Sequence, residues 1–410
     1  MEWLPERALV LGLARSGHAA ALALARRGVE VVAADRSLVA TAGRLADEGV
    51  EVRLGSEEES LLEGVQLVVK SPGVPAASPL AAAARARGIP IWSEVELGYR
   101  LLPGNPLIGV TGTNGKTTTT ELLGAVLRAA GRRVEVAGNV GRALTGVAEQ
   151  IEPGVSVVCE LSSFQLEDVH EFACDIAVLL NVEPDHLDRH GTLAAYRDAK
   201  LRIFERARAR IVPRGMGLDG IEFAADDPLP AEPLIPGLHN RENAAAATAA
   251  ARAAGVGDEA IAEALRTFAG VPHRLELVRE LRGVRYVNDS KATNAAAARR
   301  GVAAYDAPLL LILGGSLKGE DFASFARELP ANVRSIHLIG EATDELATAL
   351  DEAGRSYSRD GDLERALAHA SATAEAGDIV LLSPAAASFD QFDNFEQRGD
   401  AFRRLVEELV

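Results

Sequence analysis

The sequence has very little cysteine, no excess of positive charge and no long uninterrupted apolar run. Cys159 and Cys174 are its only cysteines, and their spacing is typical of neither a metal site nor a redox motif. Both lie within or beside apolar stretches, so we expect two small buried side chains in a reducing compartment. We expect that compartment to be the cytoplasm.

The charge balance excludes further classes of function. The chain carries 43 Lys and Arg against 59 Asp and Glu, a net charge of −16, which argues against a nucleic-acid or anionic membrane surface. No run of 18 apolar residues is present, so we expect no membrane insertion. The first seven residues include two acids and a proline and do not predict a signal peptide. Any anionic ligand must therefore be held by local groups.

The chain of 410 residues is too long for one ordinary core, and its strand and helix patterns alternate. This alternation predicts an α/β fold, and the length alone suggests two to four domains. We place a Rossmann-like domain at residues 1–92, a central domain with a phosphate loop and a mostly parallel sheet at 93–270, and a Rossmann-like α/β domain at 271–410.

Residues 107–120 are typical of a phosphate-binding loop between a strand and a helix. Glycines in such a loop let backbone N–H groups face phosphate oxygens, and the helix adds its positive N-terminal end. Lys116 would reach the outer phosphates and Thr117 would offer a hydroxyl to Mg²⁺. Val110 stands where the usual pattern has its first glycine. A plain strand-to-helix turn is the alternative, but it gives no reason for the Lys-Thr pair.

The N-terminal turn resembles a dinucleotide fingerprint whose middle glycine has become Ala14, and Asp35 follows the second strand. An NAD domain is one interpretation; a nucleotide-binding relative with a less close approach to the pyrophosphate is the other. Residues 71–73 form a sharp loop after a strand, where α/β sheets place ligands, but a simple turn is equally compatible.

Several polar residues follow apolar strands of the central domain. Glu160 ends one such strand and is placed like an acid that holds Mg²⁺. The next strand ends in residues 181–190, where His186 is a candidate ligand for a second metal; a charged surface loop is the alternative. Spacing does not distinguish Lys200 from other bases of its amphipathic helix. Asn240 could be the N-cap of a long alanine-rich helix. Residues 213–233 are rich in glycine and proline, and we expect them to form a short connection.

In the last domain, two strands at 275–279 and 284–288 lead to residues 289–294, which we expect at the start of a helix. Lys291 and Thr293 lie beside that start, which makes it a natural carboxylate or phosphate site. Residues 314–321 and 383–392 follow two other strands and are expected at the same edge of the sheet.

Five motifs together resemble the Mur ligase family, most closely its D-glutamate-adding members. They are GTNGKTTT (112–119), ELSSFQL (160–166), NVEPDHLDRH (181–190), NDSKATN (288–294) and LSPAAASFDQFDNFEQRG (382–399). The resemblance covers the chain in order. It implies an ATP-dependent ligase for peptidoglycan synthesis that adds D-glutamate to UDP-N-acetylmuramoyl-L-alanine through an acyl phosphate. It also implies two Mg²⁺ sites, with Mn²⁺ as a substitute, and we expect a monomer.

The resemblance assigns four groups of site residues. Catalysis falls to Lys116, Glu160, His186 and Lys200, and the metals to Thr117, Glu160, His186 and Lys200 as a carbamate. ATP is assigned to Gly112, Thr113, Asn114, Gly115, Lys116, Thr117, Thr118, Asn240, Asn243, Arg274 and Asp289. The UDP-sugar is assigned to Arg15, Ser16, Asp35, Arg36, Ser71, Pro72, Gly73, Asn139 and His186. D-Glutamate is assigned to Lys291, Thr293, Lys318, Ser388 and Phe395.

Other functions fit less well. Other Mur ligases and folylpolyglutamate synthases share the phosphate loop, but residues 388–399 resemble the glutamate-adding enzyme, and the Asp-Asn-Pro-Arg motif of a diaminopimelate-adding relative is absent. An NAD-dependent dehydrogenase would leave the phosphate loop and the third domain unexplained. A nucleotide switch without ligase activity would not need Lys291 and Ser388.

Overall fold

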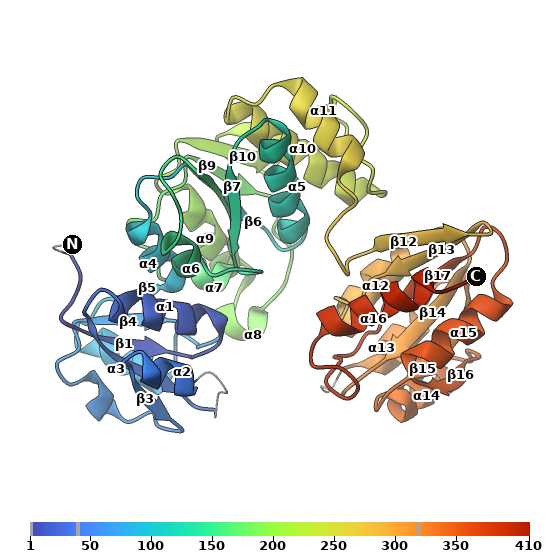
Figure 1. Ribbon diagram of the computed structural model, residues 1–410, viewed down its shortest axis with the longest axis horizontal. Helices are drawn as coiled ribbons and strands as arrows, with labels where there is room; N and C mark the ends of the chain where they lie inside the picture. The colour runs from blue at the N-terminus through green and yellow to red at the C-terminus, as the bar shows by residue number, and fades with distance from the viewer. Residues whose placement is uncertain (1–2, 38–41, 318–319) are drawn as a thin grey trace. The chain divides into compact units, whose positions relative to one another are not determined.

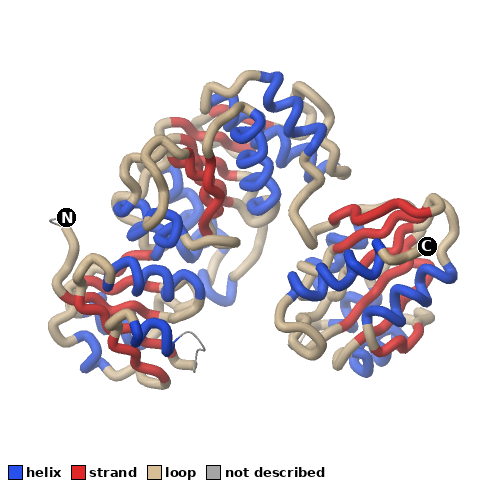
Figure 2. The backbone as a smooth tube through the Cα atoms, in the orientation of Figure 1, coloured by secondary structure: helices blue, strands red, loops and turns tan. Residues whose placement is uncertain are grey.

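The computed structural model describes residues 3–37, 42–317 and 320–410. It contains three sheets in two compact units, which we describe separately. The first unit comprises Met1–Leu234 and Leu238–Phe268, and the second comprises Ile235–Gly237 and Ala269–Val410. Figure 1 labels the elements, and Figure 2 shows the alternation of helix and strand along the chain.

The first sheet is parallel, in the order β3-β2-β1-β4-β5. Its strands are β1 (Arg7–Leu11), β2 (Glu30–Asp35), β3 (Glu51–Leu54), β4 (Leu67–Lys70) and β5 (Ile91–Ser93). Its helices are α1 (Arg15–Ala25), α2 (Ala42–Asp47), η1 (Glu59–Leu62) and α3 (Pro79–Ala86). Apolar side chains are buried on both faces of the sheet, as expected for a parallel sheet covered by helices. The order reverses between β1 and β4, which is where such sheets bind ligands.

The second sheet is also parallel, in the order β11-β10-β9-β6-β8-β7. Its strands are β6 (Leu107–Thr111), β7 (Val134–Gly138), β8 (Ser156–Glu160), β9 (Ile176–Leu179), β10 (Ala209–Pro213) and β11 (Ile221–Phe223). Its helices are α4 (Glu94–Leu101), α5 (Lys116–Ala129), α6 (Leu144–Ala148), α7 (Ser163–Leu166), α8 (Leu187–His190), α9 (Leu193–Leu201), η2 (Arg202–Phe204), α10 (Leu238–Ala253) and α11 (Asp258–Thr267). The central strand β6 delivers the phosphate loop between the ends of β8 and β9.

The second unit contains a sheet in the order β12-β13-β17-β14-β15-β16, with only the edge strand β12 antiparallel. Its strands are β12 (Glu276–Leu281), β13 (Val284–Asn288), β14 (Leu309–Gly314), β15 (Val333–Ile339), β16 (Ser358–Gly361) and β17 (Ile379–Leu382). Its helices are α12 (Ala295–Ala303), α13 (Phe322–Arg327), α14 (Thr343–Glu352), α15 (Leu363–Thr373) and α16 (Phe395–Glu407). Helices α12 to α14 bury one face of the sheet, and α15 with α16 bury the other.

The predicted α/β class with largely parallel sheets is confirmed, and two local predictions are wrong. Asn240 is not an N-cap, because α10 begins at Leu238 and places Asn240 in its first turn with a buried side chain. Residues 213–233 are not merely a connection, since β11 extends the sheet there by pairing with β10. Among the described residues, no helix is long and apolar enough to cross a membrane.

Candidate functional site

The phosphate loop leaves β6 at Thr111 and enters α5 at Lys116. Gly115 adopts a left-handed φ of +81°, and a Cβ added there would overlap Asn243 Oδ1. The predicted residue Asn243 of α10 is thus seated directly against the loop. Lys116 Nζ donates to Gly112 O (2.8 Å) and Thr113 O (2.9 Å), which folds its side chain back over the loop.

Two residues that the sequence analysis did not assign hold this loop in shape. Asn181 follows β9, and its Oδ1 accepts from the backbone N–H groups of Thr113 (3.0 Å) and Asn114 (2.8 Å). The Tyr196 hydroxyl lies 3.1 Å from Thr113 Oγ1. The place of Asn181, at the carboxyl end of the strand beside β6, is a signal that could have identified it.

Lys200 is the most unusual ionisable group near the loop. Its side chain is 1% exposed, its Nζ donates to Gly112 O at 2.7 Å, and its ammonium lies 4.5 Å from the centre of the Tyr196 ring. Burial, and then the positive charge of Lys116, lowers the pKa of Lys200 from 10.5 to about 7. Glu160 and Asp185 act in the opposite direction on the pKa of Lys200. The structure therefore brings Lys116, Lys200 and Glu160 together.

Glu160 ends β8 with its side chain almost fully buried, and its Oε1 accepts from Asn139 Nδ2 at 3.1 Å. The structure thereby places one predicted metal residue beside one predicted sugar residue. Thr117 and Thr118 are buried in the first turn of α5.

His186 lies on the exposed side of this site, in contrast to the buried Glu160 and Lys200. It adopts a left-handed φ of +51°, its side chain is about half exposed, and its ring stands 4.9 Å from that of Phe164. Asp185 Oδ2 lies 3.6 Å from His186 Nε2, which adds a carboxylate that the sequence analysis left unassigned. No direct contact between His186 and Glu160 is found among the described residues.

The donor chemistry of these residues fits a hard divalent cation. A buried carboxylate (Glu160) and a hydroxyl (Thr117) are oxygen ligands of the kind Mg²⁺ prefers beside phosphates. Asp185 and His186 could complete a second position, and a deprotonated Lys200 is available for modification.

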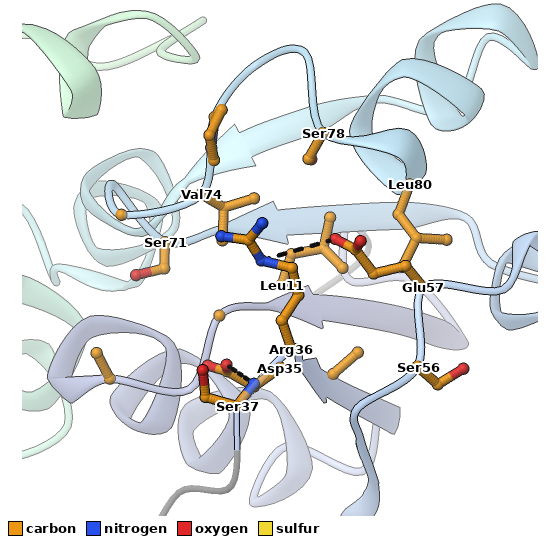
Figure 3. Close-up of a pocket in the computed structure, with 15 residues that line it drawn as sticks. Leu11, Asp35, Arg36, Ser37, Ser56, Glu57, Ser71, Val74, Ser78 and Leu80 are labelled. Carbon is orange, nitrogen blue, oxygen red and sulfur yellow. Dashed lines mark hydrogen bonds and ion pairs between the residues drawn. The ribbon is translucent and has the colours of Figure 1, made fainter. Parts of the chain in front are cut away.

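A cavity of about 210 Å³ lies at the switch point of the first sheet (Figure 3). Of the residues predicted for the UDP-sugar, it is lined by Asp35, Arg36, Ser71 and Gly73. Asp35 accepts from the backbone N–H of Leu13 (2.7 Å) and of Ser37 (2.9 Å), so this carboxylate shapes the two turns at the cavity.

The remaining predicted sugar residues do not line this cavity. Arg15 is exposed and directs its Nη1 to Gly141 O at 3.4 Å, toward the loop that carries Asn139, while Ser16 and Pro72 are half-buried. Arg36, which does line the cavity, is largely exposed, and its Nε lies 4.0 Å from Glu57 Oε1.

A polar network that the sequence analysis did not predict connects the cavity to the central domain. Val74 O, in the cavity lining, accepts from Lys70 Nζ (3.2 Å) and from Arg189 Nη2 (2.8 Å). Lys70 is buried and pairs with Asp168 at 3.1 Å. The guanidinium of Arg189 also stacks 3.9 Å from the centre of the Phe164 ring. Arg189 therefore links the cavity to the segment that carries His186.

In the second unit, predicted residues gather at the carboxyl edge of the sheet. Lys291 Nζ lies 6.0 Å from the centre of the Phe395 ring, and Thr293 is half-buried nearby in the chain. Ser388 is buried in the loop after β17. Lys318 lies outside the described residues.

Asp289 and Arg274, predicted to contact ATP, also belong to this unit. Asp289 accepts from Ser383 Oγ at 2.7 Å and is 4% exposed, and its burial raises its pKa to about 7. Its carboxyl group thus points inward in this conformation. Arg274 is half-buried and acts on the pKa of Asp289 in the opposite direction.

Arg398 organises the same edge and was not predicted. Its buried guanidinium donates to Ser290 Oγ (3.0 Å), Ser290 O (2.9 Å), Ala387 O (3.0 Å), Ala386 O (3.2 Å) and Gly314 O (3.3 Å). It thereby joins the loops after β13, β14 and β17, and burial lowers its pKa to about 10. A buried arginine within a loop-rich motif is hard to distinguish in sequence from a solvated one.

Three family models match the chain along its length. The Mur ligase MurD-like N-terminal domain matches residues 6–93, the Mur ligase middle domain residues 110–214, and the Mur ligase glutamate ligase domain residues 273–386.

Curated relatives match the whole chain. The UDP-N-acetylmuramoylalanine–D-glutamate ligase of Caldanaerobacter subterraneus subsp. tengcongensis is 40% identical over 452 residues, covering 100% of each chain. The enzyme of that name from Anaeromyxobacter dehalogenans is 42% identical over 453 residues, covering 98% of this chain and 97% of its own.

Solved structures agree on the fold. The UDP-N-acetylmuramate-alanine ligase of Thermotoga maritima has a TM-score of 0.59 at 19% identity, covering 98% of this chain and 99% of its own. The folylpolyglutamate synthase of Thermotoga maritima has a TM-score of 0.55 at 16% identity, covering 71% of this chain and 88% of its own. At these identities the likeness concerns the fold alone.

Proposed function

Because this chain belongs to the Mur ligase family, we propose that it is an ATP-dependent ligase that joins D-glutamate to UDP-N-acetylmuramoyl-L-alanine in peptidoglycan precursor synthesis. The observation that carries the proposal is sequence identity of about 40% along the full length of ligases that bear the name of this activity. The geometry of the phosphate loop and of its buried lysine supports the same chemistry.

The proposed reaction has two steps. A carboxylate oxygen of the UDP-linked alanine forms a bond to the γ-phosphorus of ATP, and the bond to ADP breaks. The amine of D-glutamate then attacks the acyl carbon and loses a proton, and inorganic phosphate leaves with the former carboxylate oxygen. Both steps move a highly charged phosphoryl group, so catalysis depends on positioning and charge stabilisation.

The phosphate loop would position and neutralise the polyphosphate. Asn181 would hold the loop in shape through the backbone N–H groups of Thr113 and Asn114, while other backbone N–H groups of the loop would face the phosphates. Lys116 would leave its two carbonyl partners to reach the outer phosphates. Thr118, Asn240 and Asn243 would complete the ATP side from α5 and α10. The family resemblance also assigns Arg274 and Asp289 to ATP.

Thr117 and Glu160 would hold Mg²⁺, with Mn²⁺ as a substitute, and His186 and a carbamylated Lys200 would hold a second ion. When bound, the cations would neutralise charge on the phosphates. The polar network of Val74 and Arg189 would keep the sugar carboxylate aligned with this site.

We propose that Lys200 reacts with CO₂ through its neutral amine: the Nζ atom forms a bond to the carbon of CO₂, one C=O π bond opens to give the carboxylate, and Nζ loses a proton to solvent. Burial lowers its pKa to about 7, which gives it an appreciable neutral population at physiological pH. The product is an anion, so the charge of Lys116 that disfavours the ammonium would favour the carbamate. This conversion would place a carboxylate beside Glu160 without a large rearrangement.

The cavity of the first sheet would receive the uridine diphosphate, with Asp35, Arg36, Ser71 and Gly73 in its lining and Pro72 in the same loop as the last two. Arg15, Ser16, Asn139 and His186 would contact the portion of the substrate that extends toward the phosphate loop. The D-glutamate carboxylates would be bound by Lys291, Thr293 and Ser388, with Lys318 and Phe395 beside them.

Domain boundaries at residues 92/93 and 270/271 are part of the proposal, and the separate sheets and family matches support them. We further propose a monomer in the cytoplasm, with no membrane insertion and no nucleic-acid partner. The two buried free cysteines and the charge of −16 support this setting.

The decisive test compares acceptors. Purified protein with ATP, Mg²⁺ and UDP-N-acetylmuramoyl-L-alanine should release phosphate when D-glutamate is added, and much less with L-glutamate, L-alanine or diaminopimelate. Equal turnover with a folate and L-glutamate would refute the assignment.

A further inference from the structure

Three potential metal ligands converge at the edge of the third sheet that β16 forms. Helix α15, which carries one of them, packs against β15 and β16 there; Figure 1 labels these three elements. His337 comes from β15, Asp360 from the edge strand β16 and His369 from α15. The side chains of His337 and Asp360 are 2% and 10% exposed, whereas that of His369 is 48% exposed. None of the three belongs to the proposed ligase site.

The three side chains are close enough to share one ion. Asp360 Oδ2 lies 3.0 Å from His337 Nδ1, and Asp360 Oδ1 lies 2.9 Å from His369 Nδ1. One candidate ligand atom from each residue lies within 4.8 Å of the other two. Zn²⁺ binds imidazole nitrogen and carboxylate oxygen at about 2.0–2.2 Å, so ligand atoms separated by roughly 3–4 Å can surround it with small adjustments.

Neighbouring hydroxyl groups orient two of the three ligands. Ser335 Oγ lies 3.1 Å from His337 Nε2, so this nitrogen can carry the proton and leave Nδ1 for an ion. Ser358 Oγ donates to Asp360 Oδ2 at 2.7 Å and also lies 3.1 Å from His337 Nδ1. Such partners of ligating residues are a regular feature of protein metal sites, because they fix the ring tautomer and the carboxylate orientation.

We propose that His337, Asp360 and His369 form a binding site for a divalent transition metal ion of the zinc class. Two imidazole nitrogens and one carboxylate favour Zn²⁺, Ni²⁺ or Co²⁺ over Mg²⁺. The exposed edge of His369 gives the ion access and leaves room for water as a further ligand. The ion would displace the protons that the Nδ1 atoms of His337 and His369 share with Asp360. It would cross-link β15, β16 and α15 and thereby hold this edge of the sheet together.

The test uses the full-length protein, stripped of metal by a chelator, with excess Mg²⁺ in every sample to occupy the oxygen-rich site. Zn²⁺ is then titrated by calorimetry, and the imidazole resonances of His337 and His369 are followed by ¹⁵N NMR. Wild-type protein should bind one equivalent of Zn²⁺ at this cluster. Binding should shift the imidazole resonances of both histidines and raise the thermal stability of the protein. His369→Ala and Asp360→Asn should each weaken that binding at least tenfold and remove the stability gain.

Asp344→Asn is the matched control, because Asp344 is an exposed carboxylate whose partner Arg359 is adjacent in sequence to Asp360. This variant should bind Zn²⁺ as the wild type does. If His369→Ala and Asp360→Asn fold and still bind Zn²⁺ like the wild type, the ion is elsewhere and the proposal fails. Unchanged imidazole resonances in wild-type protein would likewise show that the cluster is a hydrogen-bonded network only.

Discussion

Replacement of Lys200 tests the link between burial and catalysis. Lys200 is held under the phosphate loop by Gly112 O and carries the strongly lowered pKa of about 7. Lys200→Ala should fold, because the change removes a buried ammonium, but it should lose most ligase activity. Short carboxylic acids should restore part of that activity by supplying the missing carboxylate.

The size of the effect follows from the pKa. At pH 7 an ordinary lysine is neutral in roughly one molecule in 3,000, whereas a lysine with a pKa of about 7 is neutral in about half. Burial therefore raises the reactive amine population about a thousandfold. The same pKa shift means that folding with Lys200 protonated costs about 5 kcal/mol of the free energy of unfolding. This cost is fully present below pH 7, where Lys200 is protonated in both states, and it is relieved as the pH rises toward 10.5. Carbamate formation should accordingly decline as pH falls from 7 to 6.

The assay is ¹³C NMR of protein equilibrated with ¹³C-bicarbonate at pH 6, 7 and 8. One lysine carbamate signal should be present in wild-type protein, weaken at pH 6 and vanish in Lys200→Ala. Lys70→Met is the matched control: Lys70 is equally buried but paired with Asp168 at 3.1 Å, so its loss should leave the signal unchanged. Full activity in CO₂-free buffer with no carbamate signal would refute the reasoning.

Further substitutions test the loop and the edge of the third sheet. Asn181→Ala removes the acceptor of two loop N–H groups, and each of these hydrogen bonds is worth about 1 kcal/mol, so the KM for ATP should rise about tenfold or more. Asn105→Ala is the control and should leave that KM unchanged, because the side-chain amide of Asn105 donates to Glu152 O and Val155 O, away from the phosphate loop. Gly115→Ala should impair ATP turnover, because its Cβ would overlap Asn243, whereas Gly131→Ala after the same helix meets open space and should cost only about 1 kcal/mol of stability. Arg398→Lys should raise the KM for D-glutamate more than the KM for ATP. Arg403→Lys is the control: Arg403 lies later in α16 and is partly exposed, so its replacement should change neither KM. Equal effects of the two substitutions would contradict the positioning role of Arg398.

Much of the fold followed from local patterns. The strand at 284–288 was predicted with the bounds that the structure shows, and the strand before it, predicted at 275–279, lies at 276–281. Strand β11 was missed, since it pairs at a sheet edge and its exposed residues carry little apolar pattern. Asn240 was misread as an N-cap because helix ends are uncertain by one or two residues, and α10 begins two residues earlier, at Leu238.

The sequence located the phosphate loop by its own residues, but not the groups that support it from a distance. Spacing alone could not select Lys200, since its helix carries several bases and only the fold shows which one is buried under Gly112. The same holds for Asn181, Arg189 and Arg398, whose partners lie far away in the chain. Resemblance to a family supplied Lys200, and tertiary structure supplied the other three.

The central claim is that the γ-phosphate of ATP passes to a carboxylate of the sugar substrate. We would label both carboxylate oxygens of UDP-N-acetylmuramoyl-L-alanine with ¹⁸O, run one turnover with ATP, Mg²⁺ and D-glutamate, and weigh the released phosphate. The account predicts one ¹⁸O in each inorganic phosphate, because the bridging oxygen leaves with phosphorus when the amine attacks. Phosphate without ¹⁸O, released alongside the amide product, would contradict it.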